Sequence, residues 1–158
     1  MTLANLPPMD PGDFVNNDDL ARQAAAQAQV YGAFVAAGMP FVVKALGWMD
    51  VASLLSRLNG SGSTDHQHGN ALGEGYLYLY RLAAVGGDGR VYAVWEIYSK
   101  EVGSLSSSKS RTIQVDVAWT GHGIGTALAR AVRARFPVEW SGLFTPAGAR
   151  LKDRLEDA

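Results

Sequence analysis

Three glycines fall within five residues, at Gly121, Gly123 and Gly125, between a strand-like run and a helix-like run. The preceding segment RTIQVDVAW is rich in β-branched residues, and the following segment TALARAVRAR consists of small residues and good helix formers. Glycines let the backbone turn sharply and expose several amides in one direction, and the start of a helix adds free amides and a positive dipole end. A loop of this kind can hold an anion such as a phosphate.

The position of this G-x-G-x-G run argues against a dinucleotide-binding fold. Such a fold places G-x-G-x-x-G near the start of a βαβ unit. Here the run lies late in the chain, and only one more strand-like segment follows it. A tight strand-to-helix turn that binds nothing remains the simplest alternative.

The glycine-rich stretch resembles the acyl-CoA-binding motif of the GNAT superfamily of N-acetyltransferases. That motif reads Arg or Gln, two residues, Gly, one residue, then Gly or Ala, and residues 123–125 fit its end. Thr120 stands where the family prefers Arg or Gln. The resemblance covers about residues 75–145. It implies an α+β fold, of the α/β sandwich type, with a mixed, mostly antiparallel sheet flanked by helices.

The resemblance also implies acetyl-CoA as co-substrate. The backbone of Ile113, Val115 and Val117 would pair with its pantetheine arm. Arg130 lies on the helix after the motif and could approach a phosphate, although an exposed helix face explains it equally well. The pyrophosphate would rest on the amides of Gly121, His122, Gly123, Ile124, Gly125 and Thr126.

Acetyl transfer to an amine needs a neutral nucleophile and stabilisation of the thioester oxygen, which makes strand carboxylates candidate catalytic residues. Glu96 or Asp116 could serve as the base, and alternation predicts that Glu96 shares a face with Tyr92 and Tyr98. The family often places a tyrosine acid after the final core strand, but the segment SGLFTPAGARLKDRLEDA has none, so Tyr92 or Tyr98 is a candidate substitute. Packing and ion pairing explain each of these residues as well.

The remaining pattern predicts an extended proline-rich arm over residues 1–17 and one domain over 18–158. Within that domain we expect a long helix from Asp18 to Gly38, followed by a second helix that Asp50 caps. Residues 59–74 form a loop, and the run from Tyr76 to Val102 forms a β-hairpin around GGDG. A short strand after Pro137 and a carboxy-terminal helix from residue 145 complete the prediction.

Composition limits the classes of partner. The chain has no cysteine and a formal charge of -1, so thiolate chemistry is excluded and no general attraction to nucleic acid is expected, although a local arginine patch could create one. His66 and His68 lack a third ligand, so no metal site is predicted. The first residues do not resemble a secretory signal, and the default expectation is a cytoplasmic protein without a membrane span.

Two function classes follow. The first is an acyl-CoA-dependent N-acyltransferase that moves an acetyl group from acetyl-CoA directly to an amine acceptor, either a small molecule or a protein. The second is a non-catalytic GNAT-like protein that serves as a structural or interaction component of an assembly. Thr120 and the missing tyrosine motivate the second class. A second copy of the chain could cover an exposed sheet edge.

Overall fold

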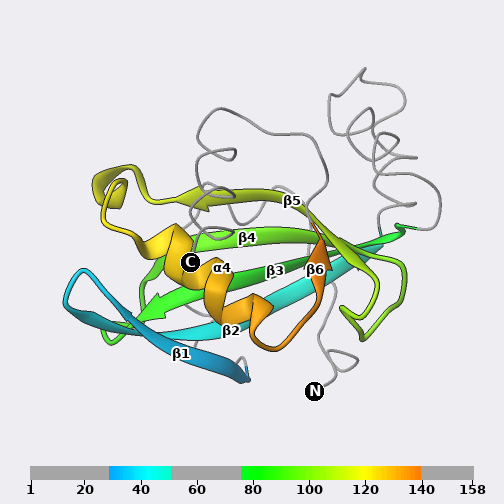
Figure 1. Ribbon diagram of the computed structural model, residues 1–158, viewed down its shortest axis with the longest axis horizontal. Helices are drawn as coiled ribbons and strands as arrows, with labels where there is room; N and C mark the ends of the chain where they lie inside the picture. Colours follow the sequence, from blue (N-terminus) through cyan, green and yellow to red (C-terminus); the bar gives the residue numbers. More distant parts are fainter. Residues whose placement is uncertain (1–28, 51–75, 140–158) are drawn as a thin grey trace.

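A computed structural model describes residues 29–50 and 76–139 of the chain. Six strands form one sheet in chain order (Figure 1). Neighbours from β1 to β5 pair antiparallel, and β5 pairs parallel with β6. The predicted mixed, mostly antiparallel sheet is therefore confirmed. The strands are β1 (Val30–Ala36), β2 (Met39–Asp50), β3 (Tyr78–Gly86), β4 (Val91–Ser99), β5 (Ser108–Val115) and β6 (Val138–Glu139).

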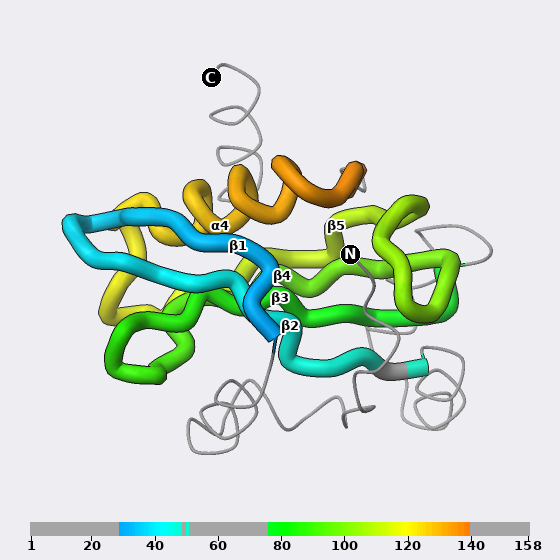
Figure 2. Tube along the Cα trace, turned by 90° about the horizontal axis from the view of Figure 1, so that it is seen from below, coloured from blue at the N-terminus to red at the C-terminus, as the bar shows by residue number. Residues whose placement is uncertain are grey.

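One α-helix covers one face of the sheet. The chain leaves β5 through a short 3-10 helix, η1 (Val117–Trp119), enters α4 (Ile124–Arg133) and returns to the sheet as β6. Figure 2 shows α4 lying along one side of the strands. Its buried face carries Ile124, Leu128 and Val132 at four-residue spacing, which is the spacing of a helix that packs one side against a core.

The sheet curls into a half-barrel around α4. Although β1 lies at the far edge of the sheet from β5, it contacts α4. The rings of Tyr31 and Phe136 lie 6.2 Å apart between centroids, and a Cβ built on Gly32 would lie 3.7 Å from Nε of Arg135. The main core fills the space between α4 and the concave sheet, with Trp95 and Leu128 fully buried.

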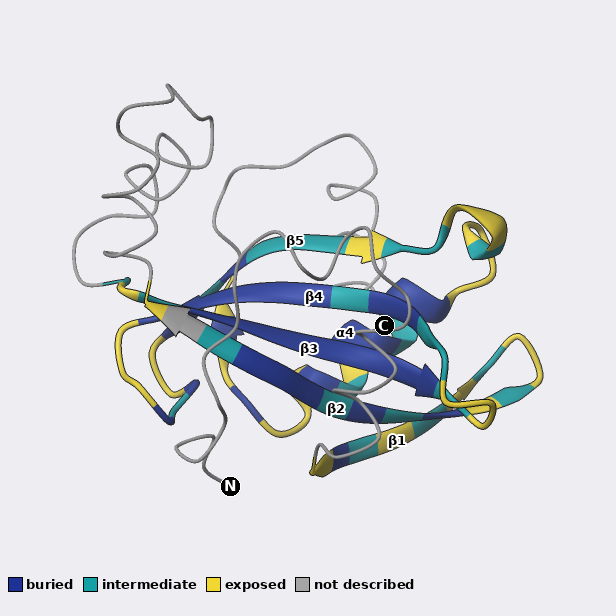
Figure 3. Ribbon diagram, turned by 180° about the vertical axis from the view of Figure 1, so that it is seen from behind, coloured by how far each residue is buried: buried dark blue, intermediate teal, exposed yellow. Residues whose placement is uncertain are grey.

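The central strands are buried on both faces. Leu79 to Val85 of β3 are all buried, and Figure 3 shows this run in dark blue along the middle of the sheet. On that second face Leu46, Ala83 and Val85 form a smaller apolar cluster. The side chains of this cluster are therefore shielded from water.

The long helix predicted from residue 18 to Gly38 is wrong where the structure describes it, because Val30–Ala36 is strand β1. The segment VYGAFVA is rich in β-branched and aromatic residues, and pairing with β2 gives its apolar side chains a packed surface. Ala37 and Gly38 have φ of 52° and 73°, which makes them the turn of a two-residue β-hairpin. This tertiary pairing outweighs the helix propensity of the neighbouring alanines.

The stretch between the two expected helices, Met39–Asp50, was not predicted as a strand but forms the twelve-residue strand β2. The second helix, expected after Asp50, lies outside the described residues. The predicted hairpin is confirmed as β3 and β4, the motif helix as α4 and the strand after Pro137 as β6. The predicted arm over 1–17, the loop over 59–74 and the helix from residue 145 lie outside the described residues.

Within the described ranges no helix is long and apolar enough to span a membrane.

Candidate functional site

Among the described residues, strand β5 has no pairing partner along one edge for most of its length. Its pairing with β6 is confined to Ser108 with Val138 and Lys109 with Glu139. In the described part of the chain, no strand pairs with that edge beyond Lys109. The open stretch leads directly toward the glycine-rich loop.

The register on β4 shows which backbone groups of β5 point to the open edge. Asp116 donates its N–H to the carbonyl of Tyr92 at 2.9 Å, so the residues in phase with Asp116 face β4. Backbone groups alternate along an antiparallel strand. The N–H and C=O groups of Ile113 and Val115 therefore face away from β4, into the open edge.

The glycine loop combines open space with a backbone shape that favours glycine. Gly121 and Gly123 both have φ of +80°, and a Cβ on either would meet nothing within 4 Å. Gly123 is the N-cap of α4, and the first helical turn contains no acidic residue. Neither glycine carries a side chain, and the described residues leave both Cβ directions open, so an anion can approach the backbone there.

Helix α4 starts directly against the open part of β5. A Cβ on Gly125 would lie 3.1 Å from Cγ2 of Val115 and 3.5 Å from Cγ2 of Ile113, so only glycine permits this approach without a shift. The amides of Ile124, Gly125 and Thr126 precede the first intrahelical donor, Ala127, which bonds to Gly123 at 3.0 Å. The free amides at the start of α4 therefore lie next to the outward backbone groups of β5. We call the loop and first helical residues, 121–126, the cradle.

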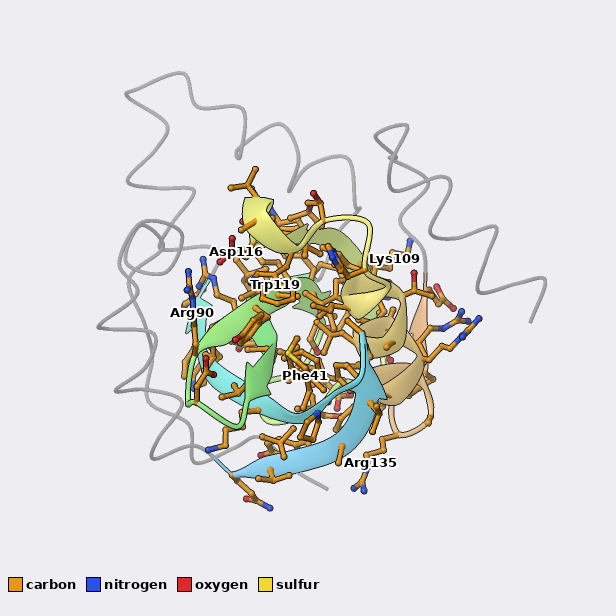
Figure 4. The ribbon with its side chains drawn as sticks, turned by 90° about the vertical axis from the view of Figure 1, so that its left-hand side faces the viewer. Phe41, Arg90, Lys109, Asp116, Trp119 and Arg135 are labelled. Carbon is orange, nitrogen blue, oxygen red and sulfur yellow. The ribbon has the colours of Figure 1, made fainter. Side chains whose placement is uncertain are left out.

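An ion pair fixes the chain between β5 and the cradle. Asp116 accepts a bond from the N–H of Ala118 at 2.9 Å through Oδ1, which caps η1. Its Oδ2 lies 3.0 Å from Nη2 of Arg90 in the β3–β4 turn, and Figure 4 shows the two side chains near each other. This carboxylate has structural partners on both oxygens. Its proposed role as a base remains a prediction.

A chain of ring contacts connects strand β4 to the cradle. Tyr92 and Trp119 lie 5.4 Å apart between centroids, and Trp119 and His122 lie at the same separation. The hydroxyl of Tyr92 donates to Oδ2 of Asp88 at 2.8 Å, and this bond raises the pKa of Tyr92 above its ordinary value. Nδ1 of His122 lies 3.2 Å from the carbonyl oxygen of Trp119 and 3.0 Å from that of Thr120. The loop is therefore held by contacts from the hairpin and within itself.

The prediction that Tyr92 shares a face with Glu96 is wrong. The register of β3 with β4 shifts next to Tyr92, since Ala84 pairs with Ala93 and Val85 with Val91. This bulge turns Tyr92 toward the main core, where its ring contacts Phe41 at 5.3 Å between centroids.

Glu96 lies between two guanidinium groups on the second face of the sheet. Its oxygens lie 3.0 Å from Nη2 of Arg81 and 2.6 Å from Nη1 of Arg111, and the carboxylate side chain is 5% exposed. Burial lowers the pKa of the Arg81 guanidinium, and the charge of Glu96 opposes that shift. Tyr98, also buried, lies on the same strand two residues on. Both residues lie away from the cradle, and their catalytic roles remain predictions.

The structure therefore brings together most of the predicted cofactor-binding residues and separates the predicted catalytic ones. Val117 is 88% exposed beside the cradle, and Arg130 is exposed in the last turn of α4. Arg90 and Trp119 were not predicted, because their roles depend on strand register. No group of three metal-ligating side chains occurs within residues 29–50 and 76–139.

Comparisons of the chain with models of protein families, with curated protein sequences and with solved structures find no match.

Proposed function

We propose that the protein is an N-acyltransferase of the GNAT type, which transfers an acetyl group from acetyl-CoA to an amine on a small molecule or a protein. The observation that carries this proposal is the open edge of β5, which runs directly into the glycine cradle at the start of α4. An elongated ligand with amide groups at one end and phosphates at the other fits this combination.

The two parts of the cradle suit two parts of acetyl-CoA. The pyrophosphate would accept bonds from the amides of residues 121–126, where the helix dipole favours negative charge. The pantetheine arm carries two amides, and these can pair with the outward backbone groups of Ile113 and Val115 as an added strand would. Close packing of Gly125 on Val115 keeps these two sites adjacent.

In the transfer step, the amine nitrogen forms a bond to the carbonyl carbon and the carbon–sulfur bond breaks. The amine loses one proton and the thiolate gains one, so the site needs a proton acceptor or a water path. Both oxygens of Glu96 already have arginine partners, Arg81 and Arg111, on the face of the sheet away from the cradle. This observation is also the one that favours the alternative, a non-catalytic GNAT-like protein that acts as a structural or interaction component.

Calorimetric titration with acetyl-CoA tests the proposal. Gly123→Glu would place a carboxylate at the cradle, and we expect it to weaken binding by about tenfold or more. Gly38→Glu is the matched control, since Gly38 has φ of +73° and an equally open Cβ direction but lies in the β1–β2 turn. Both variants carry similar backbone strain and the same change of charge.

Binding that Gly123→Glu removes and Gly38→Glu retains would support the proposal and justify a screen of amines. Equal binding by both variants would place the ligand elsewhere. No binding of acetyl-CoA by the folded wild-type protein would refute the proposal, and binding without transfer to any amine would favour the non-catalytic alternative.

A further inference from the structure

Ser110 carries a buried hydroxyl whose proton has no acceptor among the residues that the structure describes. Nε1 of Trp95 lies 2.8 Å from Oγ of Ser110, and an indole N–H can only donate. Oγ therefore accepts this bond, and its own proton points elsewhere. Within the described residues no atom accepts that proton, although Ser110 is only 6% exposed.

The neighbouring buried serine on the same strand shows the usual arrangement. Ser108 is 2% exposed and donates its hydroxyl proton to the carbonyl of Leu105 at 2.7 Å. Buried donors are nearly always paired, since leaving one unpaired costs about 1–3 kcal/mol. The free donor capacity of Ser110 thus needs an explanation that Ser108 does not.

Ser110 lies where the open edge of β5 begins. Ser108 and Lys109 pair with β6, and Ser110 is the next residue along the strand. The register between β4 and β5 also shifts here, because Glu96 pairs with Thr112 and Ile97 with Ser110. The hydroxyl is therefore at the end of the open edge farthest from the cradle.

The separation matches the length of the pantetheine arm. From Val115 to Ser110 β5 advances five residues while β4 advances four, from Ala93 to Ile97, so the separation is roughly 13–16 Å at the rise of an extended chain. An arm built from pantoyl, β-alanyl and cysteaminyl units spans roughly four or five extended residues. A ligand with its pyrophosphate on the cradle and its arm along β5 would bring its thioester to Ser110.

We propose that Ser110 donates a hydrogen bond to the acyl carbonyl oxygen of acetyl-CoA, and that Trp95 orients the hydroxyl by occupying its acceptor side. This inference rests on the proposed function. The bond would strengthen as negative charge develops on that oxygen during attack by the amine. The proton stays on Ser110 throughout, so no further acid is required for this role.

Binding measurements can test this role without any knowledge of the acceptor. Free CoA lacks the acyl carbonyl, so the ratio of its dissociation constant to that of acetyl-CoA isolates the acyl contact. We expect Ser110→Ala to weaken acetyl-CoA binding by about two- to tenfold and to leave CoA binding unchanged. Ser108→Ala is the matched control and should leave the ratio unchanged.

A second variant and a spectroscopic measurement guard against loss of folding. Ser110→Cys nearly keeps the shape and replaces a strong donor with a weak one, so it should lower the ratio in the same direction. With a ¹³C-labelled acetyl carbonyl, infrared spectra should show a lower stretching frequency for the bound ligand in the wild type than in either Ser110 variant.

An unchanged ratio and an unchanged carbonyl frequency in folded Ser110 variants would overturn the role of Ser110 while leaving the proposed function intact. Failure of both CoA and acetyl-CoA to bind the wild type would instead refute the proposed function itself.

Discussion

Oδ2 of Asp116 lies 3.0 Å from Nη2 of Arg90, so the turn between β3 and β4 contacts the residue at which the chain leaves β5. The other oxygen of the same carboxylate caps η1 through Ala118. One side chain therefore links the hairpin to the segment that leads into the cradle.

Asp116→Ala should cost more stability than Arg90→Ala, because it removes both the cap and the ion pair. The Arg90 side chain is 39% exposed, and pairs of this kind contribute about 0.2–1 kcal/mol, whereas loss of a cap costs about 0.5–2 kcal/mol. Urea unfolding of both variants measures the difference. Asp116→Asn should retain the cap and resemble Arg90→Ala, and equal losses in all three would contradict this division of roles.

Glu96→Gln should lower the free energy of unfolding by about 3–5 kcal/mol, because it leaves Arg81 and Arg111 without their buried counter-charge. Urea unfolding measures this loss, and Glu139→Gln, at the exposed residue of β6, should change stability by less than about 0.5 kcal/mol. A Glu96→Gln protein as stable as the wild type would show that the charge is not needed for folding and would strengthen the prediction that Glu96 acts as a base.

The approach of α4 to β5 can be tested with paired substitutions. Gly125→Leu should destabilise the protein by about 1–3 kcal/mol, because its Cβ would already lie 3.1 Å from Val115. Val115→Ala creates room, so the double variant should lose less than the sum of the two single losses. Additive losses measured by urea unfolding would show that the helix moves away from the strand instead.

Alkaline conditions should weaken the fold through three tyrosines. Burial raises the pKa of Tyr31 and Tyr80, and the bond to Asp88 raises that of Tyr92. The native state therefore favours the neutral phenols. Their contribution is complete below about pH 10, the ordinary tyrosine value, and is lost as the pH rises through the higher native values.

For Tyr92 this dependence has a specific test. Tyr92→Phe should reduce the fall in unfolding free energy between about pH 9 and about pH 11, because position 92 of the variant has no phenol to ionise. Urea unfolding at both pH values gives the comparison. A fall as steep as that of the wild type would show that Tyr92 does not contribute and would leave Tyr31 and Tyr80 as the tyrosines that carry the effect.

The sequence predicted the parts of the molecule whose signals are local. The GGDG turn between alternating strands and the glycines before TALARAVRAR mark β3, β4 and α4 directly. Strand β1 was missed because its alanine-rich surroundings favour a helix, and because Ala37 adopts a positive φ that no local rule predicts. Its identity depends on pairing with β2, which is a tertiary interaction.

The candidate site divides in the same way. The cradle glycines could be found from their spacing, since their role depends on backbone shape alone. The partners of Glu96 could not, because Arg81 and Arg111 reach it only through the registers of β3 and β5. The bulge at Tyr92 also breaks the alternation of side chains between the two faces of β4, so the face of Tyr92 could not be predicted. Long-range charge pairs and bulges need the sheet to be known first.

His122 offers a test of how the cradle keeps its shape. Two carbonyl oxygens lie within 3.2 Å of Nδ1, and carbonyls only accept, so Nδ1 must carry a proton. His122→Asn places an amide nitrogen close to that position, whereas His122→Gln places its amide nearer to Nε2. We therefore expect His122→Asn to bind acetyl-CoA within about threefold of the wild type, and His122→Gln to lose about three- to tenfold, since one anchoring bond contributes about 0.5–1.5 kcal/mol.

Nitrogen NMR of the imidazole provides an independent check on this anchoring. The neutral ring should show its proton on Nδ1, because the alternative tautomer would direct a lone pair at two carbonyl oxygens. If the proton resides on Nε2, or if both variants bind equally well, the side chain does not hold the loop. The cradle would then keep its shape through the glycine backbone and the ring contact with Trp119 alone.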